Sequence, residues 1–371
     1  MTTTFSHQNL NQAPHRIIKA GVIGFGFIGE VHIRAIRASG GFVHSIAAKT
    51  PSQSVSAAEK MGISNAVTIE EMVNDSDIDV IHICTPNVLH AELATLAMES
   101  GKNVICEKPF AISLPEAERI ANLAAQKNII ATIPFVYRFH PLIREARSRI
   151  KNLNEPLNLL HGYYLQDWLS LESTTNWRIN AEQGGPSRAF ADIGIHWCDL
   201  MEFVTGHRIT SINAQLMKVS RSRGYQEQIS TEDGASMLFR TDKGAQGSLV
   251  LSQVSAGRKN KLWFSFESPK ETFVFDQETS EELWIGGLSS NQIVKRGLAS
   301  EYDDAKKYSF LPPGHSQGFQ DCFNAFVSDS YKAINGNIVE GLPTFADGLR
   351  AAKLTNAVIN SSKSESWVSI S

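Results

Sequence analysis

The stretch K-A-G-V-I-G-F-G-F-I-G-E, from Lys19 to Glu30, decides the fold of this chain. An apolar run typical of a buried strand ends at three glycines, Gly24, Gly26 and Gly29, and a helix-like segment follows. The first glycine allows a tight turn, the second lets a pyrophosphate approach the backbone, and the third lets helix and strand pack closely. Free N–H groups and the dipole at the start of the helix favour phosphate. The spacing therefore predicts a dinucleotide site, against the alternative of a turn that only packs a helix on a sheet. The expected cofactor contacts here are Gly24, Phe25, Gly26, Phe27, Ile28 and Gly29.

Composition and charge are those of an ordinary globular protein. The 371 residues, 42% hydrophobic and 20% charged, are enough for two hydrophobic cores. The net charge of −3 provides no field for nucleic acid or acidic lipid, and no apolar run suits a membrane span, so we expect neither partner. Residues 1–15 are polar and are expected to form a flexible tail rather than a signal peptide. The four cysteines are scattered, which indicates buried free thiols and a cytoplasmic location.

Residues 17 to 135 alternate between strand-like and helix-like patterns. Near-continuous apolar strands separated by helices predict a doubly wound parallel sheet, with its ligand at the carboxyl ends of the strands. The expected strands are 17–23, 42–48, 80–84, 103–106 and 129–135, and the expected helices are 28–38, 53–61, 69–74, 91–99 and 114–126. We therefore predict an NAD(P)-binding Rossmann domain over residues 16–138.

The pattern changes after residue 138, with a boundary expected between Phe135 and Pro141. Strand-like stretches joined by short polar turns predict a large, mostly antiparallel open sheet. We expect strands at 159–165, 212–219, 234–239, 247–252, 262–267 and 272–276, and helices at 141–150, 197–204, 318–334 and 344–361. Residues 139–371 should therefore form a second domain that contains both strands and helices.

Two strand ends of the first domain are expected to contact the cofactor. Ala48 stands where NAD-preferring proteins place a carboxylate, and Lys49 beside it would tolerate a 2′-phosphate. The choice between NAD and NADP stays open, because Lys49 is equally typical of an ordinary solvated loop. The second strand end reads Thr85-Pro86-Asn87-Val88-Leu89-His90, where Asn87 is a candidate helix N-cap. We expect Thr85, Pro86, Asn87 and His90 beside the cofactor, and no metal, because the spacing of His82 and His90 matches no zinc pattern.

A third strand end carries two opposite charges, Glu107 and Lys108, followed by Pro109. Lysine and glutamate are among the residues least often buried, so their place at the ligand edge of a buried strand is unusual. The ammonium of Lys108 is expected to bond a substrate hydroxyl and to favour its developing alkoxide. The alternative is a surface ion pair. Glu107 and Lys108 are also expected to contact the cofactor.

These motifs together resemble the Gfo/Idh/MocA family of glucose–fructose oxidoreductases, inositol dehydrogenases and rhizopine-catabolism proteins. The resemblance rests on the early glycines, C-T-P-N-x-x-H at 84–90, E-K-P at 107–109 and D-I-G-I-H-W-C-D-L at 192–200. It implies NAD(P)-linked redox chemistry on sugars or cyclitols, and it implies that residues 139–371 form an α/β domain for substrate binding and oligomerisation. It also places Lys108, Asp192 and His196 at the family's catalytic positions. Three stretches of the second domain are similar to a narrower branch that includes anhydrosugar dehydrogenases, namely Tyr164–Trp168, Asn176–Arg178 and Gly314–Gly318.

Asp192 and His196 lie four residues apart. If a helix begins near Ile193, Asp192 is its N-cap and His196 lies one turn along the same face. The carboxylate can then orient the imidazole or bind a neighbouring substrate hydroxyl. The imidazole titrates near neutrality and can take an alcohol proton as hydride leaves the same carbon. A capping aspartate and a core histidine are the alternative readings.

Residues 163–178 contain many aromatic and polar side chains. A sugar site needs both, because aromatic rings stack on C–H faces and polar groups form hydrogen bonds with hydroxyls. A subunit interface is the alternative, since Tyr, Trp and Arg are enriched there too. The expected substrate contacts are Lys108, Arg138, Tyr164, Gln166, Trp168, Asp192, His196 and His315, and Trp177 and Arg178 are expected to border the cofactor.

The sequence thus predicts an NAD(P)-dependent dehydrogenase or reductase acting on a secondary hydroxyl of a cyclic sugar, anhydrosugar or cyclitol. It is expected to be a homodimer or homotetramer. Two alternatives retain the same fold: a redox-neutral NAD-dependent glycoside hydrolase, and a non-catalytic protein that senses dinucleotides.

Overall fold

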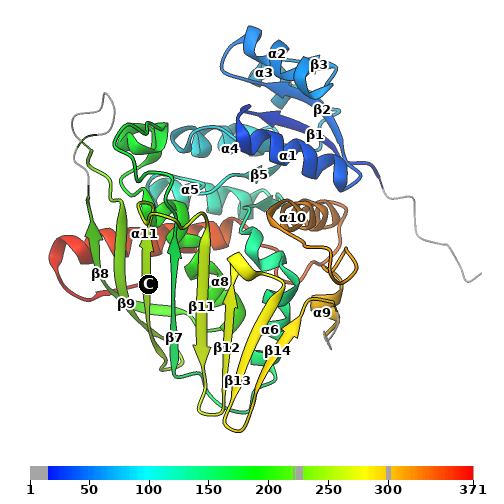
Figure 1. Cartoon of the computed structure of the whole chain (residues 1–371). Coiled ribbons are helices and arrows are strands. Elements are labelled where there is room, and N and C mark those ends of the chain that lie inside the picture. The colour runs from blue at the N-terminus through cyan, green and yellow to red at the C-terminus, as the bar shows by residue number, and fades with distance from the viewer. Residues whose placement is uncertain (1–15, 220–221, 223–228, 298–301, 371) are drawn as a thin grey trace, which may run out of the picture.

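Two sheets organise the protein, as the computed structural model shows for residues 16–219, 222, 229–297 and 302–370. A six-stranded sheet with its helices lies above a nine-stranded sheet in Figure 1. The predicted tail, residues 1–15, lies outside the described residues. No helix in the described part of the chain combines the length and apolar character that crossing a bilayer requires.

The first sheet confirms the predicted doubly wound fold. All of its strands are parallel, in the order β3-β2-β1-β4-β5-β6, which is the strand order of a Rossmann domain. The strands are apolar because helices cover both faces of the sheet. The elements are β1 (Lys19–Ile23), α1 (Phe27–Ala38), β2 (Phe42–Ala47), α2 (Pro51–Met61), β3 (Asn65–Ala66), α3 (Ile69–Asn74), β4 (Val80–Ile83), η1 (Asn87–Leu89), α4 (His90–Glu99), β5 (Asn103–Cys106), α5 (Leu114–Gln126) and β6 (Ala131–Thr132).

Two strands of this sheet differ from the prediction. The expected strand at 129–135 pairs only over Ala131–Thr132, and the amide of Ile133 instead donates to the carbonyl of Pro343. Pro134 that follows has no amide hydrogen to continue the ladder. Strand β3 has only two residues and was not expected.

The second sheet is mostly antiparallel, as predicted, with the order β14-β13-β12-β11-β7-β10-β9-β8-β15. Only the pairing of β7 with β10 is parallel among the described strands. The strands are β7 (Leu159–Leu165), β8 (Ile209–Met217), β9 (Gly234–Thr241), β10 (Gln246–Ser252), β11 (Lys261–Glu267), β12 (Glu271–Asp276), β13 (Glu282–Gly287), β14 (Asn291–Lys295) and β15 (Val368–Ser369). The last three were not predicted.

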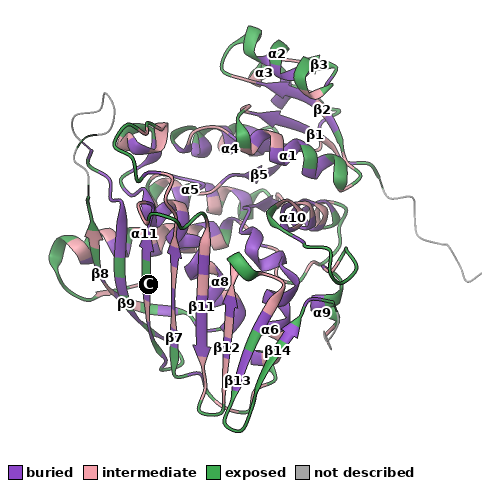
Figure 2. Ribbon diagram, viewed as in Figure 1, coloured by how far each residue is buried: buried purple, intermediate pink, exposed green. Residues whose placement is uncertain are grey.

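The helical segments of the second half connect and cover this sheet. Figure 1 shows α6, α8 and α11 behind it. They are η2 (Val136–Phe139), α6 (Pro141–Lys151), η3 (Trp177–Ile179), α7 (Ala181–Gly184), the π-helix η4 (Phe190–Gly194), α8 (Ile195–Thr205), η5 (Gln277–Thr279), α9 (Asp303–Lys306), α10 (Phe319–Ile334) and α11 (Phe345–Ser364). Side chains on β9 alternate between buried and exposed, as expected when helices cover one face (Figure 2).

Helix α10 returns to the first domain. Phe323 and Phe326 on α10 belong to the same buried cluster as Ile33 and Ile36 on α1. The hydroxyl of Ser39 donates to the carbonyl of Asn324, which fastens the end of α1 to the same helix. A segment far along the chain therefore completes the Rossmann core, and the division at residue 138 stays a prediction. The four cysteines are free and buried, as predicted.

Candidate active site

The three predicted motifs of the first domain meet at one edge of the sheet. Strands β1, β4 and β5 are parallel neighbours, so the turns that follow them lie side by side. Gly24 has φ of +96°, and a Cβ on it would lie 2.7 Å from the carbonyl carbon of Cys84. The turn after β1 therefore packs directly against the turn after β4, and only glycine fits there.

The surroundings of the other two glycines fit a dinucleotide. A Cβ on Gly29 would lie 2.7 Å from the carbonyl oxygen of Gly24, so Gly29 serves packing. A Cβ on Gly26, in contrast, would meet no atom within 4 Å, and this glycine is the N-cap of α1 without a side-chain cap. The start of α1 is thus open to an anion. Phe27 is 77% exposed there, so its ring is accessible to a cofactor. The buried hydroxyl oxygen of Thr85 has no partner in the described structure, so it is available for a hydrogen bond to a cofactor.

The end of β2 carries no acidic side chain at Ala48 or its exposed neighbour Lys49. The side chain of Thr50 accepts a hydrogen bond from the amide of Gln53 and caps α2. Nothing in this geometry discriminates against a ribose 2′-phosphate.

Asn87 does not cap a helix, contrary to the prediction. The N-cap of η1 is Pro86, and no side chain caps that turn. The Asn87 amide instead donates to the carbonyl of Gly184 at 2.9 Å, across to the second domain. The sequence at this turn carries no mark of that partner, because Gly184 lies far along the chain.

His90 joins two of the loops at the site. Its Nδ1 lies 2.7 Å from the carbonyl oxygen of Pro109 and its Nε2 lies 2.8 Å from that of Thr85. A neutral imidazole donates to only one of these acceptors at a time. Burial lowers the pKa of His90, although the two carbonyls oppose that shift. His90 therefore holds the loops after β4 and β5 together.

Lys108 reaches from the first domain to Asp192 of the second. Its Nζ donates to Asp192 Oδ1 at 2.6 Å and to the Asp192 carbonyl at 3.1 Å. Their side chains are 16% and 18% exposed, so water screens the pair only partly. Burial alone would raise the pKa of Asp192, but the charges of Lys108 and Arg178 outweigh it and hold that pKa well below its usual range. Asp192 is therefore ionised, and Lys108 pairs with this partly buried carboxylate instead of forming the surface pair with Glu107 that was the alternative interpretation.

Asp192 is not the N-cap of a helix that begins at Ile193. It lies inside the π-helix η4, and α8 begins three residues later, at Ile195. π-Helical turns often occur at functional sites, because their wider bonding pattern changes the direction of side chains. The carboxylate of Glu232 accepts hydrogen bonds from the amides of Arg188 and Phe190 just before this turn and fixes its start.

His196 lies in the first turn of α8 and close to Lys108. The ring is 8% exposed and packs edge-on against Phe135 and Tyr137, with centroid distances of 5.7 and 5.4 Å. Burial and then the Lys108 charge lower the pKa of His196 to about 3, against the opposing effect of Asp192. The imidazole is therefore neutral near pH 7. Its Nδ1 is buried and has no partner among the described residues. The carboxylate of Asp192 bonds to Lys108 and Gln253 and not to His196, so it does not orient the imidazole by a hydrogen bond, contrary to the prediction.

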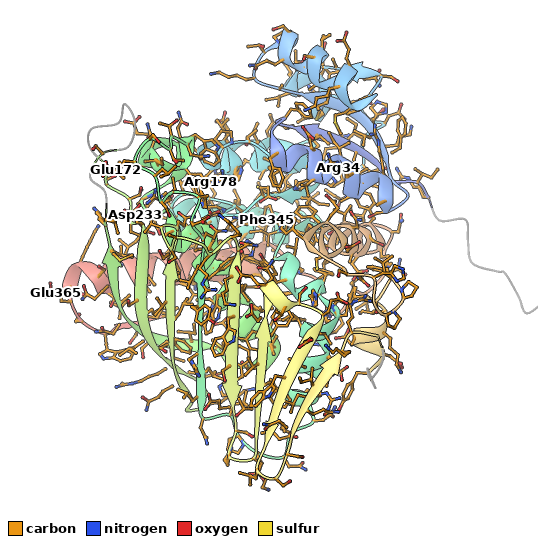
Figure 3. All side chains as sticks on the ribbon, viewed as in Figure 1. Arg34, Glu172, Arg178, Asp233, Phe345 and Glu365 are labelled. Atoms are coloured by element: carbon orange, nitrogen blue, oxygen red, sulfur yellow. The ribbon has the colours of Figure 1, made fainter. Side chains whose placement is uncertain are left out.

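Two further side chains hold Asp192. The amide of Gln253, which is 0% exposed, donates to Asp192 Oδ2 at 2.8 Å. Arg178 Nε lies 3.9 Å from Oδ1, and its guanidinium stacks on Trp177 at 4.4 Å. Figure 3 shows Arg178 close to where the two domains meet. Gln253 was not expected, because it follows a strand in a segment with no recognisable motif.

A connected set of polar side chains lies beyond His196. The hydroxyls of Tyr137 and Tyr164 are 2.7 Å apart, and both bond to the side chain of Asn260. Gln166 also donates to Asn260 at 2.8 Å. Trp168 extends the set, since its Nε1 donates to Gln166 Oε1 at 2.9 Å. The predicted residues Tyr164, Gln166 and Trp168 are thus brought together, whereas Tyr137 and Asn260 were missed.

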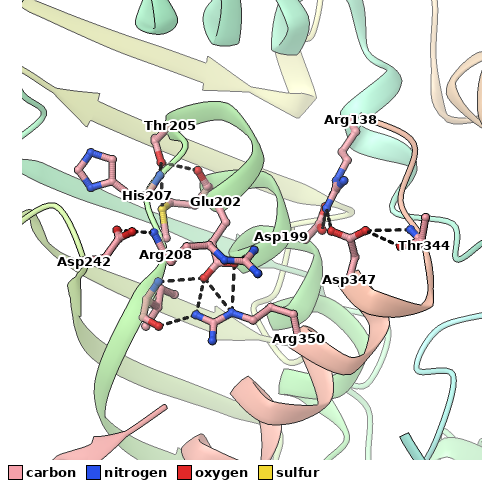
Figure 4. Close-up of polar contacts among 12 residues, drawn as sticks. Arg138, Asp199, Glu202, Thr205, His207, Arg208, Asp242, Thr344, Asp347 and Arg350 are labelled. Atoms are coloured by element: carbon pink, nitrogen blue, oxygen red, sulfur yellow. Dashed lines mark hydrogen bonds and ion pairs between the residues drawn. The ribbon is translucent and has the colours of Figure 1, made fainter. Parts of the chain in front are cut away.

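Arg138 is buried in an ion network of the second domain. It is 8% exposed, its Nε donates to Asp199 at 2.8 Å, and it also pairs with Asp347 at 2.8 Å (Figure 4). The carboxylates of Asp199 and Asp347 lie on two helices that cover the second sheet, so the ion pairs of the guanidinium hold these helices together. His315 lies in an exposed loop before α10. Their predicted contacts with substrate stay predictions, and the substrate site proposed below does not use them.

The assembled site can perform acid–base chemistry next to a dinucleotide. It combines a lysine ammonium with a neutral imidazole, supplied by different domains, beside glycines that leave room for a pyrophosphate. Among the side chains that the structure describes, no group of three His, Cys, Asp or Glu residues is arranged to hold a metal.

Comparison with known proteins identifies the family. Residues 18–135 match the family described as "Oxidoreductase family, NAD-binding Rossmann fold", and residues 156–270 match the "GFO/IDH/MocA C-terminal domain". Levoglucosan dehydrogenase of Pseudarthrobacter phenanthrenivorans is 30% identical over 398 residues, covering 98% of both proteins. The 1,5-anhydro-D-fructose reductase of Ensifer adhaerens is 30% identical over 230 residues, which are 60% of this chain and 66% of the reductase.

The fold agrees with a solved structure of the same kind. The levoglucosan dehydrogenase complex with NADH and levoglucosan is 28% identical, covers 96% of this chain and 100% of its own, and has a TM-score of 0.89. The matched regions contain the glycines, the E-K-P segment and the Asp192–His196 turn. The chain therefore belongs to the Gfo/Idh/MocA family and is an oxidoreductase that binds a nicotinamide dinucleotide.

Proposed function

We propose that this enzyme transfers hydride between NAD or NADP and a secondary hydroxyl of a cyclic sugar, anhydrosugar or cyclitol. The observation that carries the proposal is the convergence of Lys108 and Asp192, bonded at 2.6 Å between domains, next to the neutral imidazole of His196. The anhydrosugar dehydrogenase similar over almost the whole chain supports this class of substrate.

His196 is the proton acceptor in the proposed reaction. Its ring is neutral at physiological pH, so it can take the proton of the alcohol as the carbon is oxidised. Asp192 holds the Lys108 side chain in place, and the ammonium donates to the reacting oxygen and stabilises its negative charge. The bound cofactor supplies the hydride acceptor.

The polar set around Asn260 is proposed to bind the rest of the sugar. The ring of Tyr137, which belongs to this polar set, packs against the ring of His196. A substrate beside the imidazole would therefore also contact the hydroxyls of Tyr137 and Tyr164. Trp168 provides an apolar face for C–H groups of the ring. We also propose a cytoplasmic homo-oligomer, for which the buried free thiols and the broad second sheet are the supporting observations.

The replacement His196→Ala tests the mechanism. We expect kcat on an active sugar to fall by about 10²–10⁴, because proton transfer in the transition state loses its acceptor. The dissociation constant for NADH, measured by fluorescence titration, should change little. His44→Ala is the matched control, since His44 pairs with Asp75 in a partly buried contact of the first domain, with 16% and 35% of the two side chains exposed. Turnover that survives His196→Ala would remove His196 from the reaction.

A separate experiment identifies the substrate. A panel of anhydrosugars, pyranoses and cyclitols is tested with both cofactors, and turnover is followed by nicotinamide absorbance.

A further inference from the structure

A row of buried polar side chains leads away from Glu107 into the first domain. Glu107 Oε1 lies 3.2 Å from His32 Nε2, His32 Nδ1 lies 2.8 Å from His82 Nδ1, and His82 Nε2 lies 3.0 Å from the hydroxyl of Tyr331. Both histidines are 0% exposed, and Glu107 and Tyr331 are 6% and 5% exposed. Four polar groups from α1, β4, α10 and the end of β5 are thus bonded in series inside apolar packing.

We propose that His32 is a positioning residue that holds the Glu107 carboxylate ionised and fixed beside Lys108, and that this buried negative charge favours the oxidised, cationic nicotinamide cofactor over the reduced one. The inference builds on the nicotinamide dinucleotide cofactor of this family and on the proposed place of Lys108 at the reacting atoms.

With Glu107 ionised and both rings neutral, the hydrogen bonds allow one placement of the protons. The second oxygen of Glu107 accepts the amide of Lys108 at 3.1 Å, so the carboxylate accepts at both oxygens when it is ionised. His32 then carries its proton on Nε2 and accepts at Nδ1, which requires His82 to donate from Nδ1. His82 accepts at Nε2 from the hydroxyl of Tyr331. Each bond is satisfied with neutral rings, and Glu107 is the single charge of the series.

The electrostatics of the two ends agree with this placement. Burial lowers the pKa of His82 well below its usual range, so this ring stays neutral. Burial alone would raise the pKa of Glu107, but the hydrogen bond from His32 and the charge of Lys108 oppose that effect, and the pKa is lowered. The ionised carboxylate in turn raises the pKa of His196, so its field reaches the reacting groups.

That field explains the expected preference between the two forms of the cofactor. Oxidised nicotinamide carries a positive ring and the reduced form does not. A carboxylate close to the reacting groups, in surroundings less polar than water, attracts the former only. Removing the charge, or letting the carboxylate turn away, should therefore weaken binding of the oxidised form selectively.

The test compares dissociation constants of NAD⁺ and NADH for the full-length protein. Glu107→Gln should raise the ratio of the NAD⁺ constant to the NADH constant about tenfold. His32→Phe, which removes the donor, should raise it severalfold, and His32→Gln should restore it because its amide can replace Nε2–H. Phe323→Leu is the control, since Phe323 packs on His32 at 4.7 Å without joining the series. If Glu107→Gln leaves the ratio of the two dissociation constants unchanged, the proposal is overturned. It is also overturned if Glu107→Gln changes this ratio and His32→Phe does not.

A spectroscopic measurement covers the case in which His32→Phe does not fold. The ¹⁵N shifts of the wild-type imidazoles should show neutral rings, with His32 protonated on Nε2 and His82 on Nδ1. A His32 ring protonated on both nitrogens would contradict the single charge proposed here. Because neither measurement requires sugar turnover, a failure of the proposed reaction is distinguishable from a failure of this inference.

Discussion

Replacing Lys108 with methionine removes the ammonium at the centre of the site while keeping most of its volume. Lys108 is the partner of Asp192 at 2.6 Å, with 16% and 18% of the two side chains exposed. Loss of one such donor to a developing oxyanion lowers kcat by about 10²–10³. The pair is neither fully exposed nor fully buried, and Gln253 still donates to Asp192 at 2.8 Å. We therefore expect the free energy of unfolding to fall by only about 2 kcal/mol, which leaves the enzyme folded.

The same replacement makes a prediction about pH. The Lys108 charge is the second cause, after burial, that lowers the pKa of His196 to about 3. Without it the pKa of the imidazole rises, so its neutral, proton-accepting form is lost at a higher pH. The acid limb of kcat/KM for sugar oxidation should thus move to a higher pH in Lys108→Met. In the wild type, protonation of His196 should not lower kcat/KM until the pH is close to 3.

The assay is kcat/KM against pH for wild type, Lys108→Met and Lys108→Arg, with Lys127→Met as an exposed control on the same domain. Arginine keeps the charge and should leave the limb in place while still lowering kcat, because its fork differs in geometry from an ammonium. An acid limb that stays put or moves downward in Lys108→Met would refute the electrostatic coupling of Lys108 to His196.

Three further predictions concern the glycine turn and the end of β2. Gly26→Ala should weaken NADH binding about tenfold while changing the unfolding free energy by less than about 1 kcal/mol, because the added Cβ meets only open space. Gly29→Ala should instead destabilise the fold by about 1–3 kcal/mol, because its Cβ would lie 2.7 Å from a carbonyl oxygen, and equal thermal stability of the two variants would contradict this division. Ala48→Asp should lower the rate with NADPH relative to NADH by about tenfold or more, through repulsion of the 2′-phosphate. A rate ratio that Ala48→Asp leaves unchanged would mean that this strand end does not contact the adenosine ribose.

The parts of the fold that local patterns determine were predictable. The glycine turn requires a strand before it and a helix after it, and both are present as β1 and α1. Helix 69–74, strand 103–106 and helix 114–126 have the predicted bounds, because their apolar spacing and their caps lie within the same short segment. Lys108, Asp192 and His196 were predicted from family motifs, and the structure brings them together.

The parts that depend on distant segments were not predictable. Gln253 and Asn260 carry no motif, and they matter only because the second sheet places them beside Asp192 and Tyr164. The capping prediction for Asn87 followed a valid local rule, but a carbonyl of the second domain competes for its amide. The predicted helix start at Ile193 failed for a related reason, since Glu232, far along the chain, fixes an earlier helical turn.

The contacts between the domains have a consequence for how the site is assembled. Asn87 bonds to Gly184 and Lys108 bonds to Asp192, so each of the two strand ends that reach the second domain is fastened there directly. On the opposite side, α10 inserts Phe323 into the Rossmann core and brings Tyr331 to His82. A hinge between the domains would have to break polar bonds on one side and expose buried aromatic surface on the other. The arrangement of ammonium, carboxylate and imidazole is therefore set by folding, before any ligand binds, which is the preorganisation that electrostatic catalysis requires.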